Sequence, residues 1–303
     1  MNAIEAMQTE IAYQPQDLQK QDLPLPDKDC CLFVGSGDSY VAGLVAQYVS
    51  DSRALCCHPI DLIQNPSMAV GQSVYIVSIS GNTRANILAA RAARRNGVRT
   101  TAITARPASR LARACDRVIA LKYKSAGVAT AGTISFTSSM LTCISIAAKA
   151  QLPSDLGRVY RQAESLAGHV AGKIGKGAYF ILGDGIMYPA AVYGALKFNE
   201  VLGAKAFPYP AEEFCHSPLF SIKKSDQIIV MGKGGRRLAK RFNDEGFSSV
   251  HIDFKDTGIG SLMQSIFFMQ LLVLRLAQRR GLTSCYFLRN KKLLKTSSDF
   301  IYG

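Results

Sequence analysis

The feature that most constrains this chain is a unit of apolar strand, glycine-containing turn and helix that occurs in both of its halves. Residues 31–34 form a short apolar run that stops at Gly-Ser-Gly, and helical apolar spacing continues over 40–49. Residues 178–182 form a similar run that stops at Gly-Asp-Gly, with a helical segment over 189–202. The segment FVGSGDSYVAG therefore aligns with FILGDGIMYPAAVYG, and this internal repeat predicts two related halves.

Strands and helices alternate through each half. This alternation requires parallel strand pairing, with crossover helices on both faces of the sheet. We therefore predict an α/β fold with two tandem domains, each a mostly parallel sheet flanked by helices on both faces. The expected strands are 31–34, 73–77, 99–102 and 118–121 in the first half, and 178–182, 227–231 and 250–254 in the second.

The length of 303 residues fits two domains, at roughly 150 residues for each. A long apolar helix is expected over 136–150. We interpret Pro153-Ser154 as the point after this helix where the helical pattern is interrupted. From these signals we predict an N-terminal extension over 1–25, a first domain over 26–152, a linker helix over 153–175, a second domain over 176–280, and a basic tail over 281–303.

Several features favour a cytoplasmic protein. The eight cysteines show no C-x-x-C spacing, so we interpret them as small buried hydrophobes in a reducing compartment, and no metal site is expected. The N-terminal residues have no apolar core of the kind that a secretion signal needs. The most apolar stretch, 262–277, contains two glutamines and one arginine and is too short to span a membrane. We therefore expect a buried helix there and no membrane partner.

The net charge of +14 predicts an anionic partner. Nucleic acid, acidic lipid and small phosphorylated metabolites all fit this charge. The cations occur as scattered pairs and triplets, without the block of five or six like charges that is typical of a nucleic-acid-binding arm, so no nucleic acid is expected. The simpler interpretation is a solvated positive surface.

Two loops rich in hydroxyl groups follow neighbouring strands. Residues 78–83 have the sequence Ser-Ile-Ser-Gly-Asn-Thr and lie between a strand and a helix, and residues 36–39, Ser-Gly-Asp-Ser, follow the preceding strand. A helix N-terminus with small residues attracts anions, because its amides lack partners inside the helix. Since ligands bind at the carboxyl ends of parallel strands, the two loops together predict a phosphate site. The alternative is an ordinary Ser/Thr helix cap.

The first half resembles the sugar isomerase (SIS) domain family over about 120 residues, through GSGDSY, SISGNT and TARPASRLARACDRVI. In that family the S-x-S-G-x-T loop binds the phosphate of a phosphosugar. In the second half residues 231–235, Met-Gly-Lys-Gly-Gly, stand in place of this loop, so one phosphate site is expected. The resemblance implies phosphate contacts from Ser39, Ser78, Ser80 and Thr83, and weaker sugar contacts from Gly37 and Thr133.

The second half is similar to the isomerase part of glucosamine-6-phosphate synthase and to archaeal phosphoglucose/phosphomannose isomerases. The similarity lies in 195–200, Ala-Leu-Lys-Phe-Asn-Glu, and in 211–218, Ala-Glu-Glu-Phe-Cys-His-Ser-Pro. It implies that Glu200 is the catalytic base and that His216 acts in opening the sugar ring. Ser217 stands where the synthase has glycine, which is a departure from the family pattern.

The chemistry itself calls for these residue types. Moving a proton between C1 and C2 of a sugar needs one base that takes and returns it, and a carboxylate shielded from water suits that task. Ring opening needs a group that titrates near neutrality, as histidine does. Without the resemblance, Glu200 would read as an exposed helix carboxylate and His216 as a loop histidine. The resemblance also implies a lysine near the C-terminus, for which we choose Lys295, with Lys291 and Lys292 as rivals and a solvated basic tail as the alternative.

From the sequence we therefore expect a two-domain SIS phosphosugar isomerase of carbohydrate metabolism. It would interconvert glucose- or mannose-6-phosphate with fructose-6-phosphate through a cis-enediol(ate), without a cofactor. One alternative is an amino-sugar phosphate enzyme: a glucosamine-6-phosphate deaminase, or a synthase-like isomerase without glutaminase activity. A second is a non-catalytic phosphosugar-binding regulator. The resemblance also implies a homodimer whose ligand is a small phosphorylated sugar.

Overall fold

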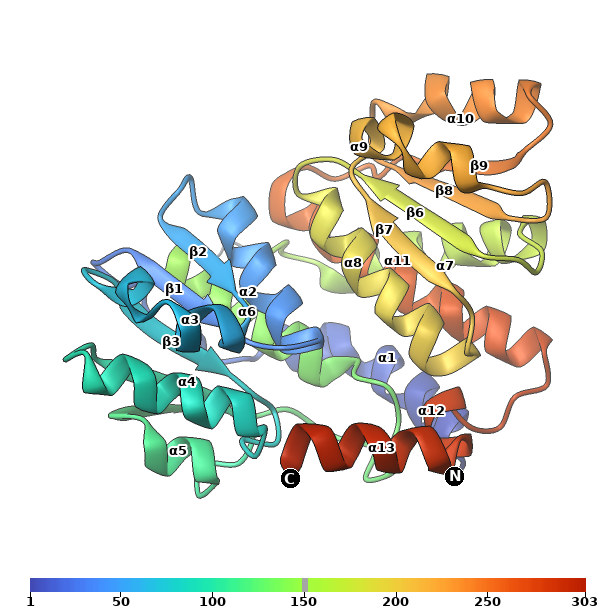
Figure 1. Ribbon diagram of the computed structural model, residues 1–303. Coiled ribbons are helices and arrows are strands. Elements are labelled where there is room, and N and C mark those ends of the chain that lie inside the picture. Colours follow the sequence, from blue (N-terminus) through green and yellow to red (C-terminus); the bar gives the residue numbers. More distant parts are fainter. Residues whose placement is uncertain (149–151) are drawn as a thin grey trace. The chain divides into compact units, whose positions relative to one another are not determined.

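The computed structural model describes residues 1–148 and 152–303 and divides into two compact units (Figure 1). Each unit contains one parallel β-sheet with helices on both faces, as the sequence predicts. Unit 1 contains residues 1–19, 125–131 and 152–290. Unit 2 contains residues 20–124, 132–148 and 291–303.

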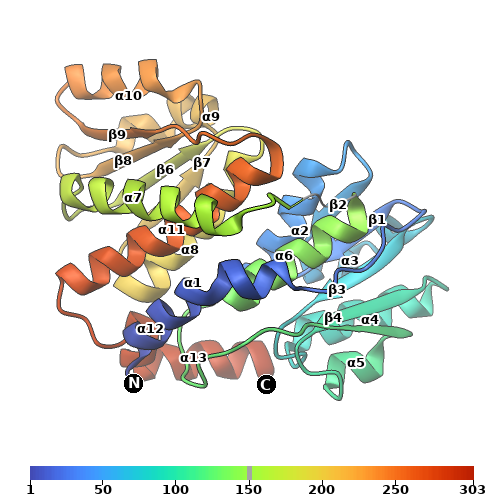
Figure 2. The same cartoon turned by 180° about the vertical axis from the view of Figure 1, so that it is seen from behind.

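The sheet of unit 2 has five parallel strands in the order β2-β1-β3-β4-β5. Helices α3, α4 and α5 cover one face, and α2 and α6 cover the other (Figures 1 and 2). The strands are β1 (Cys31–Val34), β2 (Ala54–Cys57), β3 (Ser73–Val77), β4 (Thr100–Thr104) and β5 (Arg117–Ala120). The helices are α2 (Asp38–Val49), α3 (Pro59–Gln64), η1 (Pro66–Ala69), α4 (Arg84–Arg95), α5 (Arg110–Ala114), α6 (Ile134–Ala147) and α13 (Lys291–Tyr302).

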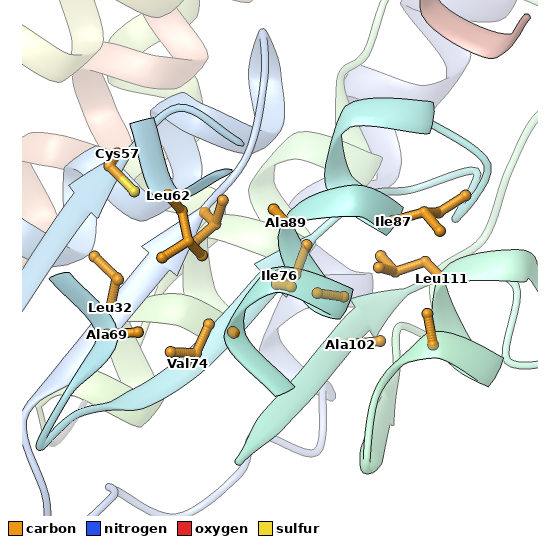
Figure 3. Packing of buried hydrophobic residues seen from close by; sticks show 14 residues of the cluster. Leu32, Cys57, Leu62, Ala69, Val74, Ile76, Ile87, Ala89, Ala102 and Leu111 are labelled. Carbon is orange, nitrogen blue, oxygen red and sulfur yellow. The ribbon is translucent and has the colours of Figure 1, made fainter. Parts of the chain in front are cut away.

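Alternate residues of the strands in unit 2 build one continuous core (Figure 3). Leu32 of β1 and Val74 and Ile76 of β3 point to the same side, because side chains in a strand alternate between its two faces. Ile87 of α4 and Leu111 of α5 close this core from above the sheet. Burial of each large aliphatic side chain contributes about 1.5–3 kcal/mol to folding.

On the other face of the same sheet, α2 approaches β1 unusually closely. A Cβ atom at Gly43 of α2 would lie 2.6 Å from Cβ of Phe33 and 2.9 Å from Sγ of Cys56. Glycine at this position therefore lets the helix backbone lie directly against the sheet. This close contact fixes the distance of α2 from the sheet, and with it the position of the loop that connects β1 to α2.

The sheet of unit 1 has four parallel strands in the order β7-β6-β8-β9. Helices α9 and α10 cover one face; α7, α8 and α11 cover the other, and α1 packs on α7 and α11. The strands are β6 (Tyr179–Gly183), β7 (Ala206–Tyr209), β8 (Gln227–Met231) and β9 (Ser248–Ile252). The helices are α1 (Ala3–Gln19), α7 (Leu156–Lys173), α8 (Met187–Lys197), η2 (Phe198–Leu202), α9 (Ala211–His216), η3 (Pro218–Ser221), α10 (Gly235–Asp244), α11 (Gly258–Arg279) and α12 (Tyr286–Arg289).

Helix α11 is the buried helix that the sequence predicts over 262–277. It is long and apolar enough to cross a membrane by composition alone, but 83% of its most apolar window is buried within the protein. The buried side chain of Gln270 has two partners: it accepts a hydrogen bond from Gln14 at 2.8 Å and donates one to the Tyr193 hydroxyl at 3.0 Å. Satisfied buried amides of this kind are typical of a core helix.

The structure differs from the sequence-based expectations at the sheet edges and the termini. Strands β2 and β7 were not predicted; both are short edge strands, and Pro208 in β7 is tolerated only at an edge. Helix α1, expected as an extension, packs within unit 1, and α13 belongs to unit 2. Helix α7, expected as a linker, packs on α11. The predicted helix over 136–150 ends at Ala147, and residues 149–150 lie outside the described residues.

Candidate functional site

The hydroxyl loop of unit 2 connects β3 to α4. Ser78 is 3% exposed, and its Oγ accepts a hydrogen bond from the Gly81 amide at 3.2 Å and lies 3.4 Å from Oγ1 of Thr83. Oγ of Ser80 accepts from the Asn82 amide at 3.3 Å. Thr83 is the N-cap of α4, but within the described residues its side chain accepts no hydrogen bond from the first turn. The first-turn amides of α4 therefore keep their donors for an anion.

Tight packing holds this loop in one conformation. Gly81 has a φ of +61°, and a Cβ there would lie 2.0 Å from Oγ of Ser109. The Gly81 carbonyl accepts a hydrogen bond from the Leu111 amide at 2.9 Å, which ties the loop to α5. The side-chain amide of Asn86, buried in α4, donates to the Val77 carbonyl at 3.0 Å. These contacts fix the start of α4 at the end of β3.

The second loop of unit 2 connects β1 to α2 and leaves the same edge of the sheet. Strands β1 and β3 are parallel neighbours, so their carboxyl ends lie side by side. Gly37, with a φ of +56°, is the N-cap of α2, and Ser39 lies in the first turn. A Cβ at Gly35 would lie 2.6 Å from the Ser39 backbone, so glycine is needed for this turn. Because the chain order reverses between β1 and β3, this edge is where open α/β sheets bind ligands.

The other candidates in unit 2 differ in exposure. Thr133 is the N-cap of α6 and is fully buried. Lys295 is exposed on α13, as are its rivals Lys291 and Lys292. All of these residues belong to unit 2, whereas Glu200 and His216 belong to unit 1.

Glu200 lies in a π-helical turn, η2, that continues α8. Its Oε2 atom lies 2.6 Å from Nζ of Lys197, whose side chain is 0% exposed, whereas the Glu200 side chain is 35% exposed. The Lys197 ammonium also lies 5.2 Å from the ring centroid of Tyr193. Lys197 is not among the site residues expected from the sequence, although it lies in the motif Ala-Leu-Lys-Phe-Asn-Glu at 195–200. The spacing of three residues before a candidate base was the signal that could have found it.

The π-helical turn itself is closely held. It ends at Gly203, which has a φ of +62°, and a Cβ there would lie 2.5 Å from the ring of Tyr286. Oδ1 of Asn199 accepts a hydrogen bond from the Ala206 amide at 3.1 Å, which links the turn to β7. Single π-turns within helices occur frequently at functional sites. Here the turn positions the Glu200 carboxylate.

His216 is the last residue of α9 and is largely exposed. Its Nε2 lies 3.8 Å from Oε1 of Glu212, with side-chain exposures of 70% and 92%. An ion pair this exposed contributes little to stability. The structure thus gives Glu200 and His216 separate partners.

The structure also locates much of the positive charge that the sequence leaves unexplained. Between positions 84 and 117 there are nine arginines, no lysine and a single acidic residue, Asp116. All nine arginines are exposed, and the first of them begins the helix that follows the hydroxyl loop. Such a surface draws anions toward unit 2. The nine are Arg84, Arg91, Arg94, Arg95, Arg99, Arg106, Arg110, Arg113 and Arg117.

Two parallel sheets with helices on both faces define an α/β protein, and the hydroxyl loop lies at the switch point of one sheet, where α/β proteins bind ligands. Within residues 1–148 and 152–303 no group of three or more His, Cys, Asp and Glu side chains could hold a metal ion. The sequence profile of the SIS domain matches residues 24–149 and 175–241. The chain belongs to the SIS domain family.

The chain is also similar in sequence to known proteins and in fold to solved structures. The chain is 28% identical over 217 residues to glutamine–fructose-6-phosphate aminotransferase (isomerizing) of Sulfurisphaera tokodaii, covering 67% of this chain but 36% of that protein. It therefore spans well under half the length of this relative. The C-terminal domain of glucosamine-fructose-6-phosphate aminotransferase from Francisella tularensis has a TM-score of 0.73 at 22% identity, covering 92% of this chain and 97% of that one. Glucosamine-6-phosphate deaminase from Thermotoga maritima has a TM-score of 0.70 at 21% identity, covering 92% and 96%.

Proposed function

We propose that this protein is a phosphosugar aldose–ketose isomerase that interconverts glucose- or mannose-6-phosphate with fructose-6-phosphate. The observation that carries the proposal is the Glu200 carboxylate, paired at 2.6 Å with a fully buried lysine on a π-helical turn. A regulator that only senses a phosphosugar needs the hydroxyl loop but has no use for such a positioned base. The match to the SIS domain family supports the substrate class.

In the proposed mechanism the phosphate is bound by Ser39, Ser78, Ser80 and Thr83, together with the first-turn amides of α4. Neutral hydroxyl and amide donors anchor the phosphate, and the exposed arginines of unit 2 raise the local concentration of the anionic substrate. His216 then transfers the proton that opens the sugar ring.

Glu200 performs the isomerisation step. Its carboxylate removes the proton from C2 of the open-chain aldose, and a cis-enediol(ate) forms. The abstracted proton can exchange with solvent while it resides on the carboxyl group. Glu200 then delivers a proton to C1 while a proton passes from the C2 hydroxyl to the C1 oxygen, so the carbonyl moves from C1 to C2 without net oxidation. Because Oε2 pairs with Lys197, we assign the proton transfer to Oε1.

Other assignments accompany this proposal. We place Lys295 near the substrate, with Lys291 and Lys292 as rivals, and give Gly37 and Thr133 weaker sugar contacts. The homodimer and the cytoplasmic location likewise remain predictions.

A second candidate function is an amino-sugar phosphate enzyme. The names of the curated relative from Sulfurisphaera tokodaii and of the solved structures favour it: aminotransferases of fructose 6-phosphate and a glucosamine-6-phosphate deaminase. The same base and histidine would serve there, with ammonia as the nitrogen donor or product.

Product analysis separates these functions. The purified protein is incubated with fructose 6-phosphate, with and without ammonium, and separately with glucosamine 6-phosphate. Formation of glucose- or mannose-6-phosphate without ammonium supports the isomerase. Release of ammonia from glucosamine 6-phosphate, or formation of that compound only with ammonium, replaces it with the amino-sugar enzyme. Binding of these sugars without turnover would favour the non-catalytic phosphosugar-binding regulator.

A further inference from the structure

A cavity of about 250 Å³ lies in unit 1 at the carboxyl ends of β6, β8 and β9. Its walls include Met187, Gly232, Lys233, Asp253, Phe254 and Asp256. The chain leaves β6 toward β7 on one side and returns to β8 on the other, so the cavity lies at the switch point of the sheet. Neither Glu200 nor His216 lines it, and the hydroxyl loop belongs to the other unit.

Three helices begin at this cavity. Met187 is the first residue of α8, Gly258 is the first residue of α11, and Lys233 precedes the start of α10 by two residues. Ile186 and Gly234, the N-caps of α8 and α10, have no side chain that could accept a hydrogen bond from the helix, and within the described residues the Thr257 side chain, at the N-cap of α11, accepts none. The positive ends of three helix dipoles and the Lys233 ammonium therefore favour an anionic group here.

The loop after β8 carries glycines that perform three separate tasks. Gly232 has a φ of +98° and makes the sharp turn. A Cβ at Gly235 would lie 2.5 Å from Cγ1 of Val230, so this glycine lets α10 pack on its strand. Gly234 has no atom within 4 Å of a Cβ, which leaves its backbone open to a ligand. These are the tasks of the glycines in βαβ units that bind nucleotides, although Gly-Lys-Gly-Gly departs from the usual spacing.

Two carboxylates supply hydrogen-bond acceptors to the same cavity. Asp253 directly follows β9, the strand next to β8, and an acidic residue at this place in such βαβ units binds a ribose hydroxyl. Asp256 uses Oδ1 to pair with Arg158 at 2.9 Å, while its buried Oδ2 has no hydrogen-bond partner among the described residues. A ligand rich in hydroxyl groups would satisfy both.

We propose that this cavity binds a ribonucleoside 5′-phosphate. Lys233 and the first amides of α10 hold the phosphate, Asp253 accepts hydrogen bonds from the ribose 2′-hydroxyl, and the base lies against Met187 and Phe254. The cavity is smaller than the roughly 300–1,000 Å³ of most drug-sized sites, so it suits a mononucleotide rather than a dinucleotide. The site is independent of the proposed isomerase activity, and it adds a second phosphate site to the one that the sequence predicts.

Calorimetric titration tests the proposal with adenosine 5′-monophosphate and uridine 5′-monophosphate as probes. We expect saturable binding that weakens about tenfold or more in Lys233→Ala and Asp253→Asn, because each change removes a charge-assisted hydrogen bond. Lys240→Ala and Asp244→Asn, which change an exposed pair on α10, are the matched controls and should bind as the wild type does. The 2′-deoxy form of each probe should bind as weakly as Asp253→Asn binds the parent nucleotide.

Three results would overturn the proposal. The first is no binding of either nucleotide up to roughly millimolar concentration. The second is wild-type affinity in both cavity variants, with their folding verified by circular dichroism. The third is displacement of the nucleotide by fructose 6-phosphate together with loss of binding in Ser78→Ala, which would place the nucleotide at the hydroxyl loop instead.

Discussion

Nζ of Lys197 lies 2.6 Å from Oε2 of Glu200, and the two side chains differ sharply in exposure. The lysine side chain is fully buried, whereas 35% of the glutamate side chain remains accessible. The carboxylate therefore compensates the charge of the buried ammonium, which also lies 5.2 Å from the centroid of the Tyr193 ring. The carboxylate can still be hydrated when the lysine is removed.

This asymmetry predicts unequal effects on stability. Glu200→Gln should lower the free energy of unfolding by about 3 kcal/mol, because it leaves a buried charge without its partner. Lys197→Met should change it by less than about 1 kcal/mol, because an apolar side chain of similar size replaces the buried ammonium. Urea unfolding of each variant measures both values.

The double variant Lys197→Met/Glu200→Gln should recover most of the stability lost in Glu200→Gln. Lys240→Met is the matched control, because it removes a lysine from an exposed pair at a similar distance of 2.7 Å, and it should shift stability by less than about 0.5 kcal/mol. Equal losses in Glu200→Gln and Lys197→Met would contradict this account of the pair.

The π-helical turn predicts a second stability effect. Gly203→Ala must adopt a φ of +62° and place a Cβ 2.5 Å from the Tyr286 ring, whereas Gly281→Ala, at a φ of +65°, has open space around it. Gly281→Ala should therefore cost about 1 kcal/mol from its backbone conformation alone, and Gly203→Ala about 1–3 kcal/mol more. Thermal unfolding measures the difference, and adding Tyr286→Ala should reduce it. Identical losses at the two glycines would refute the role of the ring.

The hydroxyl loop predicts an effect on binding. Ser78→Ala and Thr83→Val should each weaken binding of fructose 6-phosphate by about tenfold or more, since each removes a hydrogen bond to a charged phosphate. Ser67→Ala, on the exposed turn η1, is the control and should leave the affinity unchanged. Calorimetry gives the dissociation constants. Unchanged affinity in both loop variants would show that the phosphate does not bind at the hydroxyl loop.

Asp116 predicts a pH dependence of the stability of unit 2. The Thr100 amide and hydroxyl donate to its Oδ2 at 2.8 and 2.9 Å, and these hydrogen bonds, aided by Arg94, hold the pKa of Asp116 below its usual value. A lowered folded-state pKa gives stability that is present above the unfolded value of about 3.9 and is lost as the pH falls through the folded pKa. The stability difference between wild type and Asp116→Asn should be constant near neutrality and shrink below about pH 4.

Urea midpoints from acid to neutral pH measure that difference, with Asp244→Asn as the control on an exposed helix. If the stability difference between wild type and Asp116→Asn increased as the pH fell, the result would contradict this explanation.

Much of the fold was predictable because its signals are local. Every predicted strand is present, and most of them are apolar runs bounded by glycine or polar turns. Strands β2 and β7 were not predicted: each has only four residues, and β7 contains Pro208, which normally argues against a strand. The packing of the N-terminal helix was not predictable for a different reason: the contacts of α1 with α7 and α11 join residues far apart along the chain.

The candidate site likewise contains residues that the sequence predicts and one that it does not. The residues of the hydroxyl loop could be named because they are contiguous and lie between a strand and a helix. The spacing of Lys197 from Glu200 allows a pair, but the burial of Lys197 could not be predicted, because a lysine within a helix normally indicates a solvated face. Its burial follows from the position of α8 between the sheet and α11, which only the tertiary structure reveals.

The most direct test of the proposed function is solvent deuterium exchange. Glucose 6-phosphate and mannose 6-phosphate are incubated with the protein in heavy water, and proton NMR follows the C1 and C2 positions. We predict that, with the wild type and with Lys240→Met, deuterium enters C1 of the fructose 6-phosphate that forms and replaces the hydrogen at C2 of the aldose when the reaction reverses. We predict neither exchange with Lys197→Met/Glu200→Gln. Exchange at the wild-type rate in that double variant, or no exchange from either sugar with the wild type, would contradict the assignment of Glu200 as the base of an isomerase.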